Sequence, residues 1–414
     1  MYDVVVVGGG AGGLAVAASL LKRRKKLNIA IIEPSEEHYY QPAFTLVGNG
    51  LWNIKETVRP MRLVMPEGAD WLKTSVTGFE PQNNAVIVED GTRVEYEMLV
   101  VAPGLELNWE GVPGLVDALN DDNSQVVSNY HAELAPKTWE LVKRFTEGTA
   151  LFTQPAMPIK CAGAPQKAMY LSCSYWEQEK CLQNINVEFN TQTPGLFGVA
   201  AYVPPLMKYV ERYNAKLAFQ SNLVAVDGAA KKASFDVTDG DGNTTRVEKA
   251  FDMMHVTPPQ RSLQFIRESP LADAGGWVDV NMHTLQHNQF PNIFSLGDAG
   301  STPNAKTAAA VRKQAPVVAE NMIAVMDGKT QEAMYEGYGS CPLTVERGKV
   351  IMAEFGYGGK IMPTLPLDST KARRFNWFLK NDMVPHIYWD WMLRGKERMT
   401  KIRHESTGVE GMKS

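Results

Sequence analysis

The sequence has few of the features that mark several protein classes. It contains four cysteines in 414 residues, and no two of them are spaced as CxxC, so neither a disulfide scaffold nor a zinc knuckle is expected and no metal site is predicted. No run of 18 apolar residues is present, which argues against a helix that spans a bilayer. Lysine and arginine (42) nearly balance aspartate and glutamate (46), so the net charge predicts no nucleic-acid partner. A strand-like segment begins at Tyr2, and we therefore expect no signal or transit peptide at this N-terminus.

The first forty residues carry the pattern of a dinucleotide-binding unit. A short β-branched run predicts a buried strand. It is followed by a loop in which Gly8, Gly10 and Gly13 match G-x-G-x-x-G, then by an Ala- and Leu-rich helix and a second strand that ends in Glu33. The glycines permit a tight turn, a close approach to a pyrophosphate and close packing of helix on strand, and Glu33 can accept a ribose hydroxyl. A bound dinucleotide is predicted, and FAD or NAD fits this unit equally well.

Two further segments favour FAD. Residues 98–104 read MLVVAPG and residues 292–300 read NIFSLGDAG. With the glycine loop, they make the sequence similar to the flavoprotein superfamily that has two dinucleotide-binding domains. This resemblance implies that Gly104 lies where the chain leaves the first FAD segment and that Asp298 binds the ribityl chain. A helix start at Lys306 and Thr307 follows, and its positive end is expected to face the flavin. Lys306 either adds a charge there or is a solvated lysine.

The middle of the chain lacks the second glycine loop that NAD(P)H-dependent members of this superfamily carry. A strand at 150–153 continues into QPAMPIKCAGAPQ (154–166). Two prolines in this segment remove N–H donors that would hold phosphates, and a cysteine stands among them. We infer a second domain of nucleotide-binding topology without a nicotinamide site, so electrons enter from a donor other than NAD(P)H.

Two of the four cysteines have settings that suggest chemistry. Cys161 precedes a helix-like stretch and has lysines nearby, which should lower its pKa and favour the thiolate. Cys341 precedes a proline in a loop 180 residues later. Cys173 and Cys181 fit inert thiols better. From the residues alone, the pair Cys161 and Cys341 is one of six possible pairs.

Seven segments together resemble the sulfide:quinone oxidoreductase family, in particular the type found in mitochondria and many bacteria, over nearly the whole chain. This resemblance implies a redox-active bridge between Cys161 and Cys341 beside FAD. The bridge would oxidise hydrogen sulfide to a persulfide, which passes to a small sulfur acceptor, while FAD passes two electrons to a membrane quinone. Residues 121–131 hold no third cysteine, so FAD is expected to be non-covalent. The segments are KCAGAPQKAMYLS, HVTPPQ, GWVDV, LGDAG, KTAAAV, YGSCPL and AEFGY.

Aromatic and basic residues gather near the C-terminus, where residues 375–393 read FNWFLKNDMVPHIYWDWML. Short amphipathic helices of this composition lie in a membrane interface. The alternative is a helix pair that docks on the protein's own core or on a second subunit. The two apolar faces, separated by Pro385, consist of Phe375, Phe378 and Leu379, and of Tyr388, Trp391 and Met392.

The resemblance also gives an expected location and electron acceptor. Phe355 and Tyr357 are candidate aromatic residues of a quinone pocket. A monotopic protein on the surface of the lipid bilayer is expected, either of the bacterial cytoplasmic membrane or of the mitochondrial inner membrane, and a homo-oligomer is compatible with the sequence. The alternatives are a type II NADH:quinone oxidoreductase-like flavoenzyme and a non-enzymatic FAD-binding membrane protein.

The predicted fold class is α/β, with two Rossmann-like dinucleotide-binding domains in tandem and a C-terminal amphipathic membrane-associating segment. The FAD domain is expected to be discontinuous. The expected divisions are 1–112 (FAD-binding domain, first part), 113–270 (second Rossmann-like domain without a glycine loop), 271–330 (FAD-binding domain, second part) and 331–414 (quinone-site and membrane-associating region).

Overall fold

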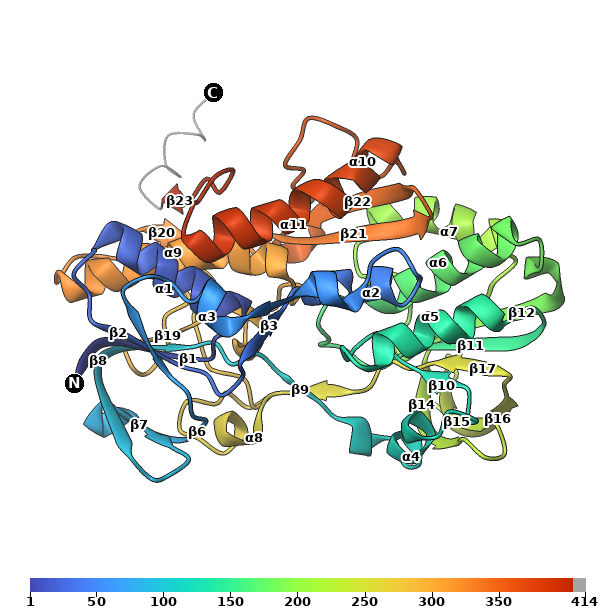
Figure 1. The fold of residues 1–414 in the computed structure, drawn as a ribbon, viewed down its shortest axis with the longest axis horizontal. Helices are drawn as coiled ribbons and strands as arrows, with labels where there is room; N and C mark the ends of the chain where they lie inside the picture. Colours follow the sequence, from blue (N-terminus) through green and yellow to red (C-terminus); the bar gives the residue numbers. More distant parts are fainter. Residues whose placement is uncertain (405–414) are drawn as a thin grey trace.

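The chain folds around two sheets that lie side by side, and the C-terminal elements run across both (Figure 1). The structure, a computed structural model, describes residues 1–404. The predicted α/β class is confirmed. The expected divisions at residues 112, 270 and 330 stay predictions.

The first sheet is built around the strand that precedes the glycine loop. Its strands are β1 (Tyr2–Val7), β2 (Ile29–Ile32), β5 (Ala69–Leu72), β6 (Val76–Glu80), β7 (Ala85–Val88), β8 (Arg93–Val101) and β19 (Ile293–Ser295). β1 runs parallel to β2 and β8 and is covered on both faces, which explains its uninterrupted valines. β19 comes after the whole second sheet in the sequence, yet it pairs in parallel with β8. The chain therefore returns to the first sheet, as a discontinuous FAD domain requires.

Two helices cover one side of this sheet and pack against each other. They are α1 (Ala11–Arg23) and α9 (Ala308–Met326). Their contact is rich in alanine, with Ala15 and Ala315 both 2% exposed, and small side chains allow the two backbones to approach closely. The glycine loop and the segment that contains Asp298 therefore lie at the two helix starts, next to each other in space.

The second sheet is parallel throughout, in the order β10-β17-β11-β12-β13. Three helices pack around it, and a separate antiparallel sheet of three strands adjoins it. The strand β11 leads into the helix α6 as β1 leads into α1. The elements are β10 (Val126–Val127), α5 (Leu134–Arg144), β11 (Gly148–Gln154), α6 (Ala164–Gln178), β12 (Ile185–Thr191), α7 (Val203–Arg212), β13 (Lys216–Ala218), β14 (Ser221–Asp227), β15 (Lys232–Thr238), β16 (Thr244–Ala250) and β17 (Met253–His255).

Shorter elements connect the two sheets. They are β3 (Glu37–Tyr39), α2 (Phe44–Val47), β4 (Val58–Pro60), α3 (Met61–Val64), β9 (Glu106–Leu107), α4 (Leu115–Asn120), β18 (Gln260–Arg261) and α8 (Gln264–Arg267). The strands β9 and β18 pair with each other where the chain leaves the first sheet and where it returns.

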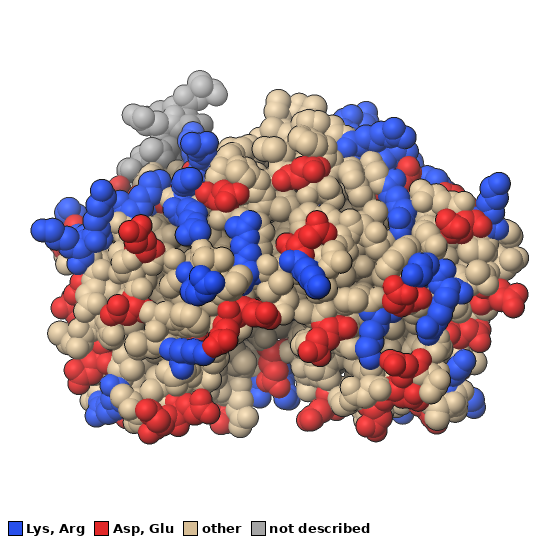
Figure 2. All heavy atoms as spheres, in the orientation of Figure 1, with Lys and Arg blue, Asp and Glu red and all other residues tan. Residues whose placement is uncertain are grey.

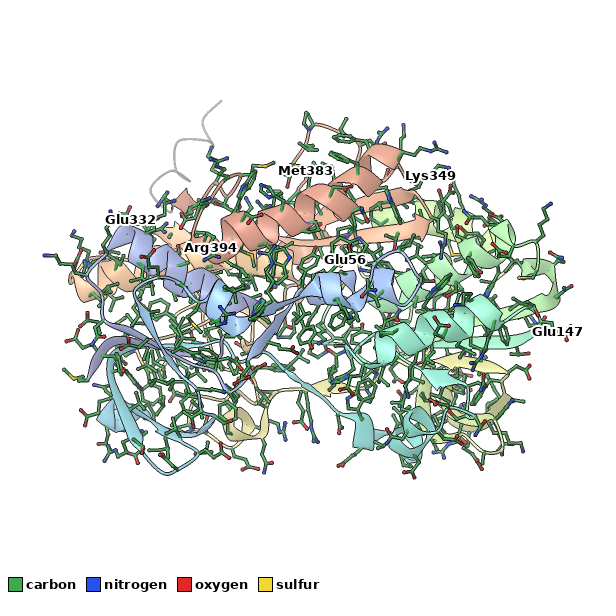
Figure 3. All side chains as sticks on the ribbon, in the orientation of Figure 1. Glu56, Glu147, Glu332, Lys349, Met383 and Arg394 are labelled. Carbon is green, nitrogen blue, oxygen red and sulfur yellow. The ribbon has the colours of Figure 1, made fainter. Side chains whose placement is uncertain are left out.

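The C-terminal region begins as a hairpin on the second sheet and ends on the first. The strands β21 (Gly339–Glu346) and β22 (Lys349–Phe355) pack against α6. A helical segment over residues 374–394 follows and includes α10 (Arg374–Phe378) and α11 (Val384–His386). In Figure 3 the labelled Met383 and Arg394 mark its course toward the first sheet. Within residues 1–404, no helix combines the length and apolar character needed to cross a membrane.

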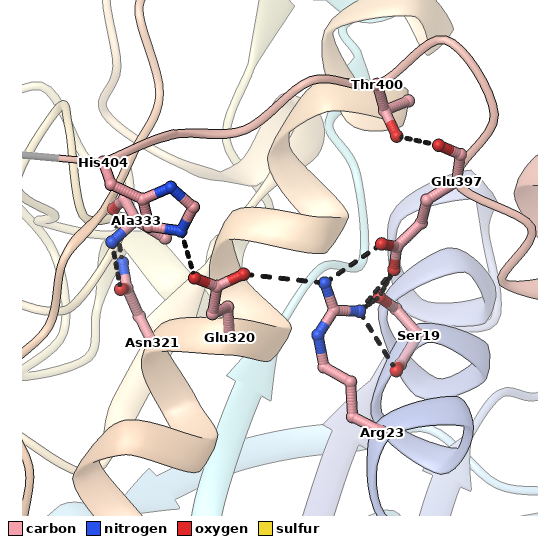
Figure 4. A network of polar contacts seen from close by, with 8 residues as sticks. All are labelled: Ser19, Arg23, Glu320, Asn321, Ala333, Glu397, Thr400 and His404. Carbon is pink, nitrogen blue, oxygen red and sulfur yellow. Dashed lines mark hydrogen bonds and ion pairs between the residues drawn. The ribbon is translucent and has the colours of Figure 1, made fainter. Parts of the chain in front are cut away.

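The last described residues are fastened to both helices of the first sheet (Figure 4). The Arg23 guanidinium of α1 binds the carboxylates of Glu397 and Glu320, and Ser19 donates to Glu397. His404 lies against Glu320 of α9. This network holds residues 397–404 across α1 and α9, where β23 (Arg403–His404) pairs with β20 (Ala333–Met334).

The two predicted apolar faces of the C-terminal segment have different environments. Phe375 and Phe378 are 48% and 49% exposed, whereas Tyr388 and Met392 are 5% and 7% exposed. The prediction that both faces meet a membrane was wrong for Tyr388 and Met392. Their side chains pack into the core of the first sheet instead, which is the self-docking alternative, and the ring of Tyr40 packs against Tyr388 at a centroid distance of 4.9 Å.

Candidate active site

The fold brings Cys161 and Cys341 together. Cys161 lies between β11 and α6 with φ +53°. Cys341 lies in β21, opposite Ala353 of β22, and is fully buried, so its predicted place in a loop was wrong because the hairpin partner β22 extends the strand through it. Their sulfur atoms are 3.9 Å apart, compared with about 2.05 Å in a disulfide, so both cysteines are free thiols here. The Cys161 backbone N–H donates to the Lys306 carbonyl over 2.8 Å. The pair therefore lies on the second sheet, where that sheet meets the segment before α9.

The two thiols have opposite electrostatic settings. The Cys341 thiol, which donates to the Cys161 sulfur, and the Lys167 ammonium, 3.2 Å from that sulfur, hold the pKa of the Cys161 thiol well below its usual value. The hydrogen bond to Cys161 and full burial raise the pKa of the Cys341 thiol well above its usual value. In the reduced pair, Cys161 is therefore the thiol that loses its proton first.

A second lysine reaches this pair from the C-terminal segment. Lys380 is 3% exposed, and its ammonium donates to the Pro42 carbonyl over 3.2 Å. Burial and the nearby Lys167 lower the pKa of Lys380 to about 7, although the negative charge on Cys161 opposes this shift. In the sequence, Lys380 stands among the basic residues around the aromatic cluster. The feature that distinguishes it is its position on the opposite helical face from Phe378.

The other two cysteines lie elsewhere. Cys173 is inside α6, fully buried, and burial raises its pKa. Cys181 is 9% exposed beyond the same helix, and its thiol donates to the Trp176 carbonyl. Burial also raises the pKa of Cys181. Both thiols are thus protonated and belong to the packing of the second sheet.

The glycine loop has the backbone that its sequence predicts. Gly8 has φ +96°, and a Cβ on Gly13 would lie 1.8 Å from the Gly8 carbonyl oxygen. Any larger residue at position 13 would push α1 away from β1. The carboxylate of Glu33 accepts the Gly9 N–H over 2.7 Å and the Ser35 N–H over 2.7 Å, so it is held beside the loop.

This edge of the first sheet fits an FAD. A Cβ built on Gly10 or on Gly104 meets no atom within 4 Å, so open space lies in front of both. Among the described residues, no side chain caps the start of α1, and its first turn has no acidic residue. Its N–H groups are therefore available to phosphates.

The Asp298 region has a more enclosed arrangement than the sequence suggests. Burial raises the pKa of Asp298, while Lys306 and Lys160 oppose the shift. Lys306 is 5% exposed, and its ammonium donates to the carbonyls of Asp298 and Gly300 over 2.7 and 3.0 Å. It also lies 4.0 Å from the Trp277 ring centroid, and burial lowers its pKa to about 8. Lys306 is thus a buried cation that fixes the turn before α9, and the alternative of a solvated lysine is wrong.

The helix α9 starts as predicted next to this turn. The Thr307 side chain accepts the Ala310 N–H over 3.2 Å and caps the helix. The Gly297 N–H before it donates to Gln314 over 2.9 Å. The positive end of the helix and the Lys306 ammonium therefore occur on the same side of the first sheet, beside the cysteine pair.

The two candidate quinone residues lie at the end of β22. Phe355 packs edge-on against Phe197, with centroids 5.8 Å apart. The Tyr357 hydroxyl donates to the Met282 carbonyl over 2.6 Å, and its ring packs against Tyr335. Phe355 remains partly exposed, whereas the hydroxyl of Tyr357 is engaged in holding its own loop.

Within residues 1–404, no group of three or more histidine, cysteine, aspartate or glutamate side chains is arranged to hold a metal. The charged groups that face the cysteine pair are instead the ammonium groups of Lys167 and Lys380. The charged surroundings of the pair are therefore cationic.

Known proteins are similar to this chain in sequence and in fold. Residues 2–193 match the family described as pyridine nucleotide-disulphide oxidoreductase. The mitochondrial sulfide:quinone oxidoreductase of Mus musculus is 39% identical over 89% of this chain and 81% of its own length. That of Dictyostelium discoideum is 41% identical over 89% and 80%. The sulfide:quinone oxidoreductase structure from Aquifex aeolicus shares the fold, with a TM-score of 0.78, 20% identity and coverage of 96% and 92%. By its identity with the two mitochondrial relatives, this chain belongs to the sulfide:quinone oxidoreductase family.

Proposed function

We propose that this protein oxidises hydrogen sulfide at Cys161 and Cys341 and passes two electrons through non-covalent FAD to a membrane quinone. The observation that carries the proposal is the pairing of two cysteines, 180 residues apart in the chain, at a sulfur–sulfur distance of 3.9 Å with opposite pKa shifts. Two thiols without a chemical role would not need pKa values shifted in opposite directions.

The difference in pKa assigns a role to each sulfur. When the pair is joined as a disulfide, hydrosulfide attacks one sulfur and the other leaves as a thiolate. Exchange is faster when the leaving thiol has the lower pKa, so the leaving group is Cys161 and the attacked atom is Cys341. A new S–S bond forms between hydrosulfide and Cys341, the bond to Cys161 breaks, and its electron pair stays on Cys161 beside Lys167.

The cycle closes when the persulfide sulfur of Cys341 passes to a small nucleophilic acceptor. Cys341 is then released as a thiolate, and re-forming the disulfide with Cys161 frees two electrons. FAD, when bound, supplies a two-electron acceptor that can hand these electrons to a quinone. Gly8, Gly10 and Gly13 would face its pyrophosphate, and Asp298 its ribityl chain.

Lys167 and Lys380 would keep the anionic sulfur species in place. Their ammonium groups are the cations that lower the pKa of the Cys161 thiol. Hydrosulfide, thiolate and persulfide all carry negative charge, and a cation in a buried site attracts each of them more strongly than in water.

Membrane attachment is assigned to the exposed part of the C-terminal region. Ile361, Leu367, Phe375 and Phe378 are between 40% and 49% exposed. Figure 2 shows an uncharged crest over the loop before α10, with lysine and arginine side chains on either side of it. Aromatic and aliphatic groups beside basic ones suit the interface of an anionic bilayer. Phe355 and Tyr357 remain candidates for the quinone pocket.

A flotation assay with anionic vesicles tests this surface. The double variant F375N/F378N should reduce the bound fraction strongly, by about tenfold or more in partition coefficient. Burial of a whole aromatic side chain contributes about 1.5–3 kcal/mol, and about half of each of these two side chains is exposed and can enter the bilayer. The matched control Y388F/M392L alters the buried face and should bind as the wild type does. Equal binding by all three proteins would remove Phe375 and Phe378 from the proposal.

Anaerobic titration tests the reaction itself. Addition of sulfide together with sulfite, as a small sulfur acceptor, should bleach the flavin absorbance with one equivalent of sulfide per FAD, and a quinone should restore it. NADH should leave the flavin oxidised, because the loop before α6 carries prolines and Cys161 where a glycine loop would bind NADH. Rapid bleaching by NADH and none by sulfide would favour an NADH:quinone oxidoreductase instead.

A further inference from the structure

Gly9, in the middle of the glycine loop, has a hydrogen bond on each of the two peptide groups that flank its Cα. Its N–H donates to Glu33 over 2.7 Å. Its carbonyl oxygen lies 3.1 Å from Nδ1 of His38, in β3. The first bond holds the peptide group Gly8–Gly9 and the second holds the peptide group Gly9–Gly10, so together they fix the direction in which the N–H groups of the loop point.

The hydrogen bonds of His38 determine its tautomer. A carbonyl oxygen can only accept, so Nδ1 must carry a hydrogen and donate it to Gly9. Burial, with a smaller contribution from Arg59, lowers the pKa of His38 to about 4, so the ring is neutral and Nε2 has no hydrogen. Nε2 therefore accepts the Tyr388 hydroxyl, 2.6 Å away. The bond at one ring nitrogen sets the proton on the other.

Tyr388 belongs to the C-terminal segment, 350 residues from His38. The segment is attached along its length to the elements that follow the glycine loop. Asn381 accepts the Trp52 indole N–H over 2.8 Å, and Arg394 donates to the Leu63 carbonyl over 2.8 Å. Tyr388 is thus held in place by its own segment, and its hydroxyl is a fixed donor for His38.

We propose that Tyr388 and His38 are positioning residues through which the C-terminal segment keeps the glycine loop in its FAD-binding conformation. The inference rests on the proposed function in one respect, that FAD is the dinucleotide bound at this loop. Without the Tyr388 hydroxyl, the tautomer with hydrogen on Nε2 becomes accessible, and a bare Nδ1 would repel the Gly9 carbonyl. The loop would then lose one of its two supports, and FAD would leave more readily.

Removal of single hydroxyl groups tests the proposal. Tyr388→Phe should raise the dissociation constant of FAD about three- to tenfold, as expected for one lost hydrogen bond, and should change the visible circular dichroism of the bound flavin. Tyr40→Phe is the matched control. Its ring packs against Tyr388, 4.9 Å away, and its hydroxyl has no hydrogen-bond partner among the described residues. This control should bind FAD as the wild type does.

Two substitutions at His38 separate its two bonds. In His38→Asn the side-chain N–H can take the place of Nδ1–H and keep the bond to Gly9, whereas in His38→Gln the amide reaches toward Tyr388 instead. His38→Asn should therefore bind FAD more tightly than His38→Gln, by about threefold or more. Thermal unfolding of the apoproteins shows whether each variant is folded.

The outcomes separate this inference from the proposed function. Equal FAD affinity in Tyr388→Phe and Tyr40→Phe, whether unchanged or reduced, would overturn the positioning role, because a packing effect would not depend on the hydrogen bond. A wild-type protein that binds no FAD would overturn the proposed function together with the inference. Normal sulfide oxidation by Tyr388→Phe with weakened FAD affinity would support the inference.

Discussion

The turn between β1 and α1 and the turn between β11 and α6 stand at equivalent places in two sheets, yet they carry different residues. The first consists of glycine and alanine from Gly8 to Gly13. The second contains prolines at 155 and 158 and places Cys161 just before its helix. Each turn ends at a helix start, which favours an anion. The first turn has uncapped backbone N–H groups, as a phosphate site requires. The second turn has a lysine beside the Cys161 sulfur.

The comparison shows how one topology supports two kinds of chemistry. The start of α1 has neither an acidic nor a basic side chain in its first turn, so contact with a ligand depends on the backbone. The start of α6 carries Lys167, whose ammonium lies 3.2 Å from the Cys161 sulfur. Helix N-termini favour negative charge in both cases, but only the second turn holds its anion as part of the protein.

The turn between β11 and α6, residues 155–163, is called the sulfur turn below. Sulfide oxidation there should be lost when the sulfur of either cysteine is removed. In Cys161→Ser or Cys341→Ser, sulfide-dependent flavin reduction should fall below about 0.1% of the wild-type rate, since a nucleophilic unit loses nearly all its activity with any one member. FAD should stay bound, because the glycine turn is intact. Stopped-flow absorbance measures both properties. Cys173→Ser, at the buried cysteine of α6, is the control and should keep its activity. Normal reduction in both site variants would end the assignment.

Substitutions in the turn between β1 and α1, residues 8–13 (the glycine turn), should affect protein stability and FAD binding separately. Gly13→Ala places a Cβ against the Gly8 carbonyl inside the protein, so it should lower the Tm of the apoprotein. Gly10→Ala meets open space, so the apoprotein should keep its Tm while the FAD dissociation constant rises about tenfold or more from contact with the pyrophosphate. Differential scanning fluorimetry and flavin fluorescence give the two values. A normal FAD affinity in Gly10→Ala would mean that the dinucleotide does not approach this loop.

The sequence predicts those features of the site that are formed by residues close together in the chain. The glycine loop, Thr307 and the missing second loop are contiguous motifs, and their backbone chemistry alone predicts them. The contact between Cys161 and Cys341 depends on the hairpin β21–β22 packing on α6, so the residues alone left six pairs open and the resemblance to a family was needed.

Where a feature depends on packing between segments far apart in the chain, the prediction was wrong or was not made. The periodicity of Tyr388 and Met392 predicts an apolar face but not which surface it meets, and the partners His38 and Tyr40 lie at the other end of the chain. Lys306 looks like any lysine before a helix, and its burial follows from Trp277 and two carbonyl groups that the sequence does not bring together. Lys380 escaped notice for the same reason.

The charge that stabilises the sulfur turn can be removed without removing the sulfur. Lys167→Met should raise the pKa of the Cys161 thiol by about one unit or more, since an opposite charge at this distance lowers a pKa by 1–3 units. The thiolate would then form at higher pH. Ultraviolet absorbance of the thiolate in the reduced protein, followed against pH, measures the shift. Lys160→Met is the control, because Lys160 donates to Gln41 instead. Superimposable titrations of wild type and Lys167→Met would show that the Cys341 hydrogen bond and the helix start lower the pKa without help from Lys167.

The smallest effect concerns Lys380, the cation that the C-terminal segment adds to the sulfur turn and that has no counterpart at the glycine turn. Its pKa is about 7 in the folded protein and 10.5 in the reference state. Between these values the unfolded chain binds more protons than the folded one, so stability rises with pH. Lys380→Met should therefore be more stable than the wild type near pH 7, and this advantage should shrink by about 1 kcal/mol for each pH unit up to pH 9.

Thermal unfolding of the two apoproteins at pH 7, 8 and 9 measures this difference, with Lys371→Met as the exposed control. A constant difference across the range would place a full positive charge on Lys380 throughout. That outcome would mean that the negative charge on Cys161 outweighs burial at this lysine. The sulfur turn would then hold its anion with two permanent cations, whereas the glycine turn holds its phosphate with none in its first helical turn.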